Sequence, residues 1–370
     1  MSNTLFYIGV MSGSSLDGID VALTEITEHQ CKVVATNFQA YSDNTKASLL
    51  ALHFPSENEL EQSALMANQL AACYAQAINA LLEQNNLNPN QISAIGCHGQ
   101  TIRHQPTLNG SIGYTIQLGN NALLAELTNI TVVGDFRSRD IAAGGQGAPL
   151  VPAFHQSAFA SKDKNRAIVN IGGIANISYL NTSGEVMGFD SGPGNMLLDH
   201  WVKLKLGKSY DADGTWSSTG AVQADLLKTM LSDPYFSLPP PKSTGRDLFN
   251  EAWLSQHIAK SNISDADIAR TLLELTVTTV YQHLMQHCPE VDEVYVCGGG
   301  VHNQFLLACL QQRLGGITMA LTDHLGVNAD WVEAAAFAWL AKQTITHQPG
   351  NLPAATGANG LRILGAIHLA

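Results

Sequence analysis

The sequence lacks the features that would place it in several common classes of protein. Only 14% of its 370 residues are charged and the formal net charge is −12, so a nucleic-acid backbone or an anionic membrane surface would on average repel it. No stretch reaches the ~18 apolar residues of a membrane span, and the first residues show no basic region before a cleavable apolar stretch. We therefore expect a cytoplasmic protein with no nucleic-acid or membrane partner.

The spacings that mark metal, redox or common nucleotide sites are also missing. The six cysteines form no CxxC pair, and the 13 histidines form no HxH or HExxH pair. There is neither a GxxxxGK[ST] phosphate loop nor a GxGxxG turn. These absences exclude a metal hydrolase, a P-loop enzyme and a Rossmann enzyme, and they favour reduced, structural cysteines.

The length and the 45% of hydrophobic residues suit a packed α/β protein with two domains. Residues 5–10, 19–26 and 31–38 predict three strands, followed by a long loop and by a helix that starts at the capping box Ser56–Glu59. The same order returns in residues 167–190, with a glycine turn after its first strand. This repeat indicates an internal duplication, and coincidence is the alternative for strands this short. We expect one lobe over residues 1–150, a second over 151–370, and a cleft between them.

Further strands are predicted in residues 93–101 and 130–140, where they should end in polar loops as parallel strands do. Those loops would carry His98, Gln100, Arg103, Arg137, Arg139 and Asp140, and the arginines could hold a carboxylate or a phosphate. Each of these residues alone is more often an ordinary surface contact. Late in the chain, a strand over 293–297 runs into Gly298, Gly299 and Gly300 and then into a helix, which suits a nucleotide.

Two glycine-rich turns could bind phosphate. The first holds Ser12, Gly13, Ser14, Ser15, Leu16, Asp17, Gly18 and Ile19, whose small residues and hydroxyls let phosphate oxygens approach the backbone. The second holds Gly172 and Gly173 at the equivalent place in the repeat. A structural hairpin explains either turn alone, but it explains the pair less well.

Two carboxylates are candidates for chemistry. Asp190 closes an apolar strand before Gly and Pro turn residues, where it is well placed to abstract a proton, and a turn-capping aspartate is an equal alternative. Glu333 opens an apolar helix, where the helix dipole alone would favour an acidic residue. Spacing does not decide either case.

The chain closely resembles the anhydro-N-acetylmuramic acid kinases in segments that follow in order over nearly its whole length: GVMSGSSLDGID, GCHGQTIRH, GDFRSRDIAAGGQGAPLVPAFH, NIGGIANIS, FDSGPGNMLLD, VCGGGVHN and DWVEAAAFAWLA. The family is similar to the sugar kinases, heat-shock chaperones and actin. The resemblance implies two duplicated ribonuclease-H-like (actin-like ATPase) lobes with a central cleft. It also implies conversion of 1,6-anhydro-N-acetylmuramic acid, ATP and water into N-acetylmuramic acid 6-phosphate and ADP during peptidoglycan recycling.

By this resemblance, Asp190 is the catalytic base and residues 12–19 with Gly172 and Gly173 are the phosphate loops. Gly298–Gly300 lie on the adenosine side, and Gln100, Arg137 and Glu333 lie near the sugar. ATP and Mg²⁺ are the expected cofactors, with unknown metal ligands. Asn170 stands where distant relatives carry an aspartate, which weakens a metal role for the second loop.

The expected partner is a small amino-sugar substrate, and a homodimer is left open. Two other functions compete with this interpretation. A sugar kinase with an ordinary hydroxyl acceptor needs the same base and phosphate loops. A nucleotide-driven assembly or chaperone-like protein would need a peptide-binding appendage or a filament loop, and no segment resembles either.

Overall fold

The chain divides into two compact units. The computed structural model describes residues 5–13, 16–27, 31–108, 110–246, 248–259 and 263–370. The first unit comprises Met1–Ala158 and Trp331–Ala370, and the second comprises Phe159–Asp330. The expected boundary at residue 150 lies close to the first of these divisions. The expected second lobe over 151–370 differs from them, because the last segment of the chain packs with the first unit.

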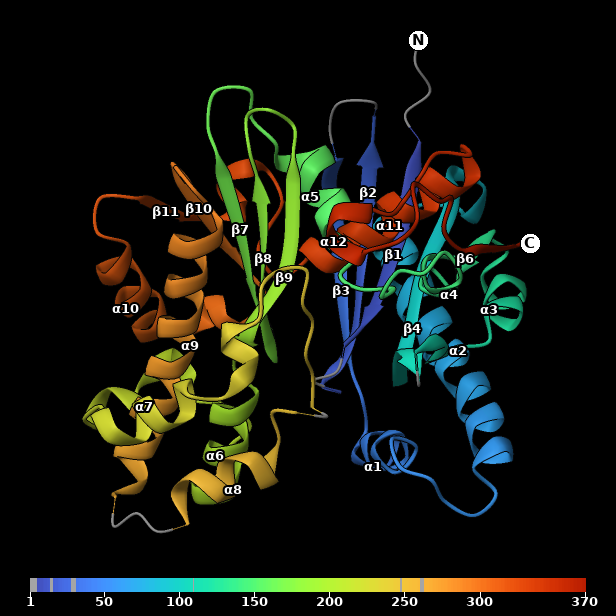
Figure 1. The fold of residues 1–370 in the computed structure, drawn as a ribbon. Coiled ribbons are helices and arrows are strands. Elements are labelled where there is room, and N and C mark those ends of the chain that lie inside the picture. The colour runs from blue at the N-terminus through green and yellow to red at the C-terminus, as the bar shows by residue number, and fades with distance from the viewer. Residues whose placement is uncertain (1–4, 14–15, 28–30, 109, 247, 260–262) are drawn as a thin grey trace. The chain divides into compact units, whose positions relative to one another are not determined.

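The first unit is built on a seven-stranded mixed sheet in the order β12-β6-β4-β1-β2-β3, with β5 paired to β4 (Figure 1). β1, β2 and β3 form an antiparallel meander, while β4 is parallel to β1 and β6 is parallel to β4. The strands are β1 (Phe6–Ser12), β2 (Gly18–Ile26), β3 (Cys31–Ala40), β4 (Ile92–Leu108), β5 (Ser111–Leu118), β6 (Val132–Gly134) and β12 (Ala366–His368).

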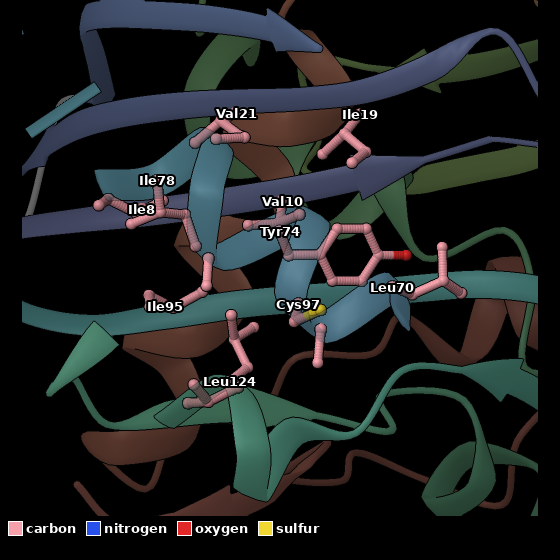
Figure 2. Close-up of a cluster of buried hydrophobic side chains, with 14 of the residues drawn as sticks. Ile8, Val10, Ile19, Val21, Leu70, Tyr74, Ile78, Ile95, Cys97 and Leu124 are labelled. Carbon is pink, nitrogen blue, oxygen red and sulfur yellow. The ribbon is translucent and has the colours of Figure 1, made fainter. Parts of the chain in front are cut away.

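Helices complete this unit and bury the sheet. α2 buries residues at helical spacing, among them Leu70, Tyr74, Ile78 and Leu81. Figure 2 shows Tyr74 and Ile78 among apolar side chains of β1, β2 and β4. The helices are α1 (Asp43–Ala51), α2 (Glu59–Gln84), α3 (Asn121–Thr128), α4 (Ser138–Ala142), α5 (Val151–Phe159), which ends at the division between the units, α11 (Val332–Ile345) and α12 (Pro353–Thr356).

The second unit repeats the strand order of the first. Its five-stranded sheet runs β11-β10-β7-β8-β9, again an antiparallel meander followed by two parallel strands. Its strands are β7 (Arg166–Ile171), β8 (Ile174–Leu180), β9 (Val186–Pro193), β10 (Glu293–Cys297) and β11 (Thr318–Leu321). The shared order confirms the duplication that the repeat predicts.

The helices of the second unit follow the meander and flank β10. α9 begins at Asp265, and the hydroxyl of Ser264 accepts a hydrogen bond from the Asp267 N–H, which caps the start of the helix. The helices are α6 (Met196–Leu206), α7 (Ala224–Leu231), α8 (Glu251–Ile258), α9 (Asp265–His287) and α10 (Gln304–Leu314).

α11 belongs to the first unit because glycines let it lie close to the sheet. A Cβ on Gly9 of β1 would lie 1.7 Å from the Ala334 carbonyl oxygen, and one on Gly96 of β4 would lie 1.9 Å from that of Phe337. Only glycine permits such contact on the strand side. On the helix side, the alanines of α11 have short side chains that also let the backbones approach closely. The C-terminal segment therefore covers the strands with which the chain begins.

The sequence prediction was wrong in several local details of the first unit. The predicted long loop contains the helix α1. The predicted capping box is only half formed: the Glu59 carboxylate accepts from the Ser56 N–H at 3.2 Å, but the N-cap is Asn58, which has no side-chain cap bond. β4 continues to Leu108, so His98, Gln100 and Arg103 lie within a strand and not on a loop.

Among the described residues, no helix combines the length and apolarity that crossing a membrane requires.

Candidate active site

The first glycine-rich turn joins β1 to β2 in the first unit. Ser12 ends β1, Gly18 and Ile19 begin β2, and Ser14 and Ser15 lie outside the described residues. The Gln100 amide from β4 donates to the Gly13 carbonyl at 3.0 Å, which fixes one side of the turn. The Gly18 N–H donates to the Asp17 carboxylate at 2.9 Å, which fixes the other side.

Several side chains of this turn are buried and make contacts inside the first unit. Leu16 and Ile19 are buried in the hydrophobic cluster under α2, and the Ser12 hydroxyl forms a 2.8 Å hydrogen bond with the Tyr74 hydroxyl. A ligand can therefore meet these three residues mainly through their backbone. Asp17 is exposed and Gly13 is partly exposed, so these two are accessible at the tip.

Arg137 lies beside this turn and is held by a histidine from β4. Its guanidinium donates to the His98 Nε2 at 2.7 Å and to the Gly147 carbonyl at 2.7 Å. The His98 Nδ1 lies 3.3 Å from the Ser12 carbonyl, so the tautomer that suits both contacts carries its proton on Nδ1. Burial, together with the nearby Arg137 charge, lowers the pKa of His98 to about 3. A neutral imidazole therefore links Arg137 to the end of β1.

Glu333, in the first turn of α11, shares this region with Arg137 and Asp17. Burial raises the pKa of its carboxyl, the Arg137 charge lowers it, and Asp17 raises it further. The structure thus brings together Gln100, Arg137 and Glu333 around the first turn. His98 was a candidate in the sequence, but only the structure shows that it holds Arg137.

The second glycine-rich turn joins β7 to β8 in the second unit. The Gly173 carbonyl accepts from the Gly194 and Met196 N–H groups, and the Gly172 carbonyl accepts from the Asn195 N–H, so this turn caps the start of α6. A Cβ on Gly172 would meet only the Ile174 oxygen at 3.6 Å, an ordinary contact. Packing therefore leaves room for a side chain at position 172.

The three glycines after β10 also differ in how much room the fold leaves for a side chain. Gly298 has φ +81°, and its Cβ would lie 2.2 Å from the Asn170 Oδ1. A Cβ on Gly300 would lie 2.6 Å from the Ile171 side chain. Gly299 is exposed, and no atom lies within 4 Å of where its Cβ would be. The fold therefore requires Gly298 and Gly300, while Gly299 is open to a ligand.

Asp190 lies inside β9, which continues to Pro193, and not at the end of the strand. Its Oδ2 accepts from the Thr244 N–H at 2.9 Å, its N–H donates to the Lys242 carbonyl at 3.0 Å, and its carbonyl accepts from the Tyr235 hydroxyl at 2.8 Å. The carboxylate is half-buried. One of these hydrogen bonds orients the carboxylate and the other two fix the backbone that carries it, an arrangement that suits a positioned base.

Asp190 is the last member of a polar row across three strands. Asn170 on β7 pairs with Asn176 on β8, and Asn176 pairs with Asp190 on β9. Residues directly opposite one another in neighbouring strands present side chains to one face. Asn176 is the residue in this row that sequence reasoning missed, although its motif was noted; a cross-strand pair has no signal in a single sequence.

The remaining candidates have structural contacts. Arg103 pairs with Glu59 at 2.9 Å, and the buried Asp140 accepts from Asn351, Thr356 and the Gly147 N–H. Arg139 is exposed on α4. Within the described part of the chain, no three His, Cys, Asp or Glu side chains come together as metal ligands would.

Solved structures of low similarity match most of the chain. One is an activator of 2-hydroxyisocaproyl-CoA dehydratase from Clostridium difficile with bound ADPNP, at TM-score 0.46 and 12% identity over 93% of this chain and 98% of that one. Another is a ROK family glucokinase from Streptomyces griseus with glucose and AMPPNP, at TM-score 0.41 and 13% identity over 91% and 99%. Likeness at this level does not assign the family.

Sequence similarity assigns the family. Residues 5–370 match the family model described as anhydro-N-acetylmuramic acid kinase. The chain is 54% identical over 364 residues to the anhydro-N-acetylmuramic acid kinase of Nitrosomonas europaea, covering 98% of this chain and 99% of the relative. It is 52% identical over 363 residues to that of Nitrosospira multiformis, covering 98% of each. The chain belongs to the anhydro-N-acetylmuramic acid kinase family.

Proposed function

We propose that this chain opens the 1,6-anhydro ring of 1,6-anhydro-N-acetylmuramic acid with water and transfers the γ-phosphoryl group of ATP to the freed 6-oxygen. The products are N-acetylmuramic acid 6-phosphate and ADP, and the reaction serves peptidoglycan recycling in the cytoplasm, where ATP is supplied. The observation that carries this proposal is more than 50% identity, over essentially the full length of both chains, to relatives that bear the kinase name.

Asp190 is the general base of this reaction. Its carboxylate takes a proton from water, the water oxygen bonds to the anomeric carbon, and the bond from that carbon to the 6-oxygen breaks. The electron pair that remains on the 6-oxygen attacks the γ-phosphorus, and ADP leaves. The hydrogen bonds from Thr244 and Tyr235 hold the carboxylate and its backbone for this task.

Arg137, Gln100 and Glu333 bind the sugar. The guanidinium of Arg137 provides charge-assisted donors for the carboxylate of the substrate, and its orientation is set by His98 and Gly147. The Gln100 side chain is buried, and its Oε1 has no hydrogen-bond partner among the described residues, which fits a substrate donor.

The two glycine-rich turns and the glycines after β10 bind ATP. At Gly172 and Gly299 a side chain would fit, so close approach of phosphate or adenosine is the constraint that keeps glycine there. Mg²⁺ would neutralise charge on the transferring phosphoryl group when bound. Mg²⁺ is usually held by few protein groups together with phosphate oxygens and water, and the Asn176 amide oxygen beside Asp190 is a donor that fits.

The test is Asp190→Asn, which is nearly isosteric and removes the base. We expect kcat to fall by roughly 10²–10⁴-fold with ATP binding little changed, because a positioned general base has about that effect. Ring opening and phosphorylation should be lost together, measured as sugar and phosphosugar by mass spectrometry.

A variant that still releases unphosphorylated N-acetylmuramic acid, or that loses ATP affinity in proportion to kcat, would contradict the assignment. Offering N-acetylmuramic acid to the wild-type enzyme is the matched control. Its phosphorylation at a comparable rate would favour an ordinary sugar kinase.

A further inference from the structure

One short segment of the second unit makes every hydrogen bond described above for Asp190. We call residues 234–245, between α7 and α8, the 234–245 segment. It supplies the Tyr235 hydroxyl to the Asp190 carbonyl, the Lys242 carbonyl to the Asp190 N–H, and the Thr244 N–H to Oδ2 of the carboxylate. The orientation of the carboxylate therefore depends on where this segment lies.

Lys242 fastens the segment to the body of the unit. Its side chain is buried, and its Nζ lies 2.7 Å from the His283 Nε2 on α9 and 3.2 Å from the Tyr235 carbonyl. The ammonium group also lies 4.6 Å from the centre of the Tyr235 ring. One side chain thus joins both ends of the segment to a long helix that is packed against β9 and β8.

The protons of this pair are arranged consistently. The His283 Nδ1 lies 2.7 Å from the Thr279 carbonyl one helical turn earlier, so it carries the proton and Nε2 accepts from Lys242. Burial lowers the pKa of His283 to about 4, with the Lys242 charge acting in the same direction. Burial lowers the pKa of Lys242 to about 8, while Asp190 raises it. At neutral pH a charged lysine therefore donates to a neutral histidine.

We propose that Lys242, held by His283, is a positioning residue that acts through Asp190 by fixing the 234–245 segment against α9. This inference rests on the proposed function of Asp190 as the base. A shift of about 1 Å in a reacting group can cost about 10²-fold in rate, so loosening the segment should lower kcat without removing any group that touches ATP.

A merely structural lysine would predict something else. Replacing such a lysine would lower stability, and it would lower kcat by the same factor whether or not the Asp190 carboxylate is present. A positioning residue has no further effect once the carboxylate is gone, because residues that act as a unit are not additive. The double variant therefore separates the two roles.

The experiment measures kcat, the KM for each substrate and the thermal midpoint for Lys242→Met, which keeps length and removes the ammonium. We expect kcat to fall about 10–100-fold with the KM for ATP within about twofold. In Asp190→Asn, adding Lys242→Met should change kcat by less than about threefold. Lys228→Met, on the exposed face of α7, is the matched control and should behave as wild type.

Three further variants keep the test decisive if Lys242→Met folds poorly. His283→Gln retains a side-chain acceptor for Lys242 and should keep more activity than His283→Leu, which removes the acceptor that joins Lys242 to α9. Tyr235→Phe removes one hydroxyl and should lower kcat by a smaller factor.

The outcomes distinguish this inference from the proposed function. If Asp190→Asn is inactive but a folded Lys242→Met has wild-type kcat, or if the two losses multiply in the double variant, the positioning role is overturned and the base remains. If Asp190→Asn itself keeps wild-type activity, the assignment of the base fails and the positioning role fails with it.

Discussion

Arg137 and His98 illustrate how much of the candidate site depends on single hydrogen bonds between side chains. The guanidinium is fixed from one side by a neutral imidazole and from the other by a backbone carbonyl. Such a fixed fork can recognise a carboxylate in one orientation, whereas a lysine at the same place would act only as a point charge.

Arg137→Ala should raise the KM for the sugar more than the KM for ATP. Loss of a hydrogen bond to a charged group is worth about 1.5–3 kcal/mol, so we expect roughly a 10–100-fold change for the sugar. Steady-state kinetics with each substrate varied in turn measures this. Arg139→Ala, two residues away and exposed, is the control. Equal effects on both substrates would place Arg137 near the triphosphate.

Sequence reasoning selects candidates that stand in compact motifs, and it does not reveal residues whose contacts depend on the fold. Asp190 lies in a recognisable strand, Arg137 follows one, and Glu333 opens a helix. Lys242 and His283 are 41 positions apart, and their hydrogen bond depends on how the 234–245 segment packs on α9. A polar contact of that kind leaves no periodic pattern in the sequence from which it could be predicted.

Among the elements, the turn after β10 offers a test of which glycines serve packing and which serve binding. Gly300→Ala would press a Cβ against Ile171 and should destabilise the protein by about 1–3 kcal/mol. Gly299→Ala meets no neighbour, so its thermal midpoint should match wild type while the KM for ATP rises. Calorimetry and kinetics on both variants provide the comparison. A destabilised Gly299→Ala with normal KM would reverse the assignment.

The strands of the two meanders were predictable, whereas β5, β11 and β12, the strand lengths and the helix starts were not. Alternating apolar residues and glycine turns mark the meanders of both units. β4 runs through His98 and Gln100 because β5 folds back and satisfies its backbone groups as far as Leu108, a pairing that local composition does not reveal. The helix α2 starts at Glu59 because Asn58 adopts left-handed φ, 56°, before it.

For the whole molecule, buried histidines should make the fold sensitive to acid. Burial lowers the pKa of His98 and His155 to about 3 and that of His104 and His283 to about 4. The unfolded chain takes up these protons below about pH 6.5, while the folded chain does not. The free energy of unfolding should therefore fall as pH drops from 6.5 towards 4, by about 1.4 kcal/mol per pH unit for each histidine.

Urea unfolding at pH 7, 6 and 5 measures this slope. His155→Leu removes one buried titrating group, so its slope should be smaller by about 1.4 kcal/mol per pH unit whatever its stability at pH 7. An unchanged slope would mean that His155 is protonated in the folded state. Three of these histidines belong to the first unit, which should be the more acid-sensitive of the two.

The return of the C-terminal segment to the first unit sets an order on biosynthesis. A growing chain delivers residues 159–330 as one continuous piece, which can collapse on its own strands as soon as it emerges from the ribosome. In the sheet that is made first, the surface around Gly9 and Gly96 stays uncovered until α11 is made, after the whole second unit. The oldest part of the polypeptide is thus the last to be finished, and a chain truncated before residue 331 should be held by chaperones or aggregate.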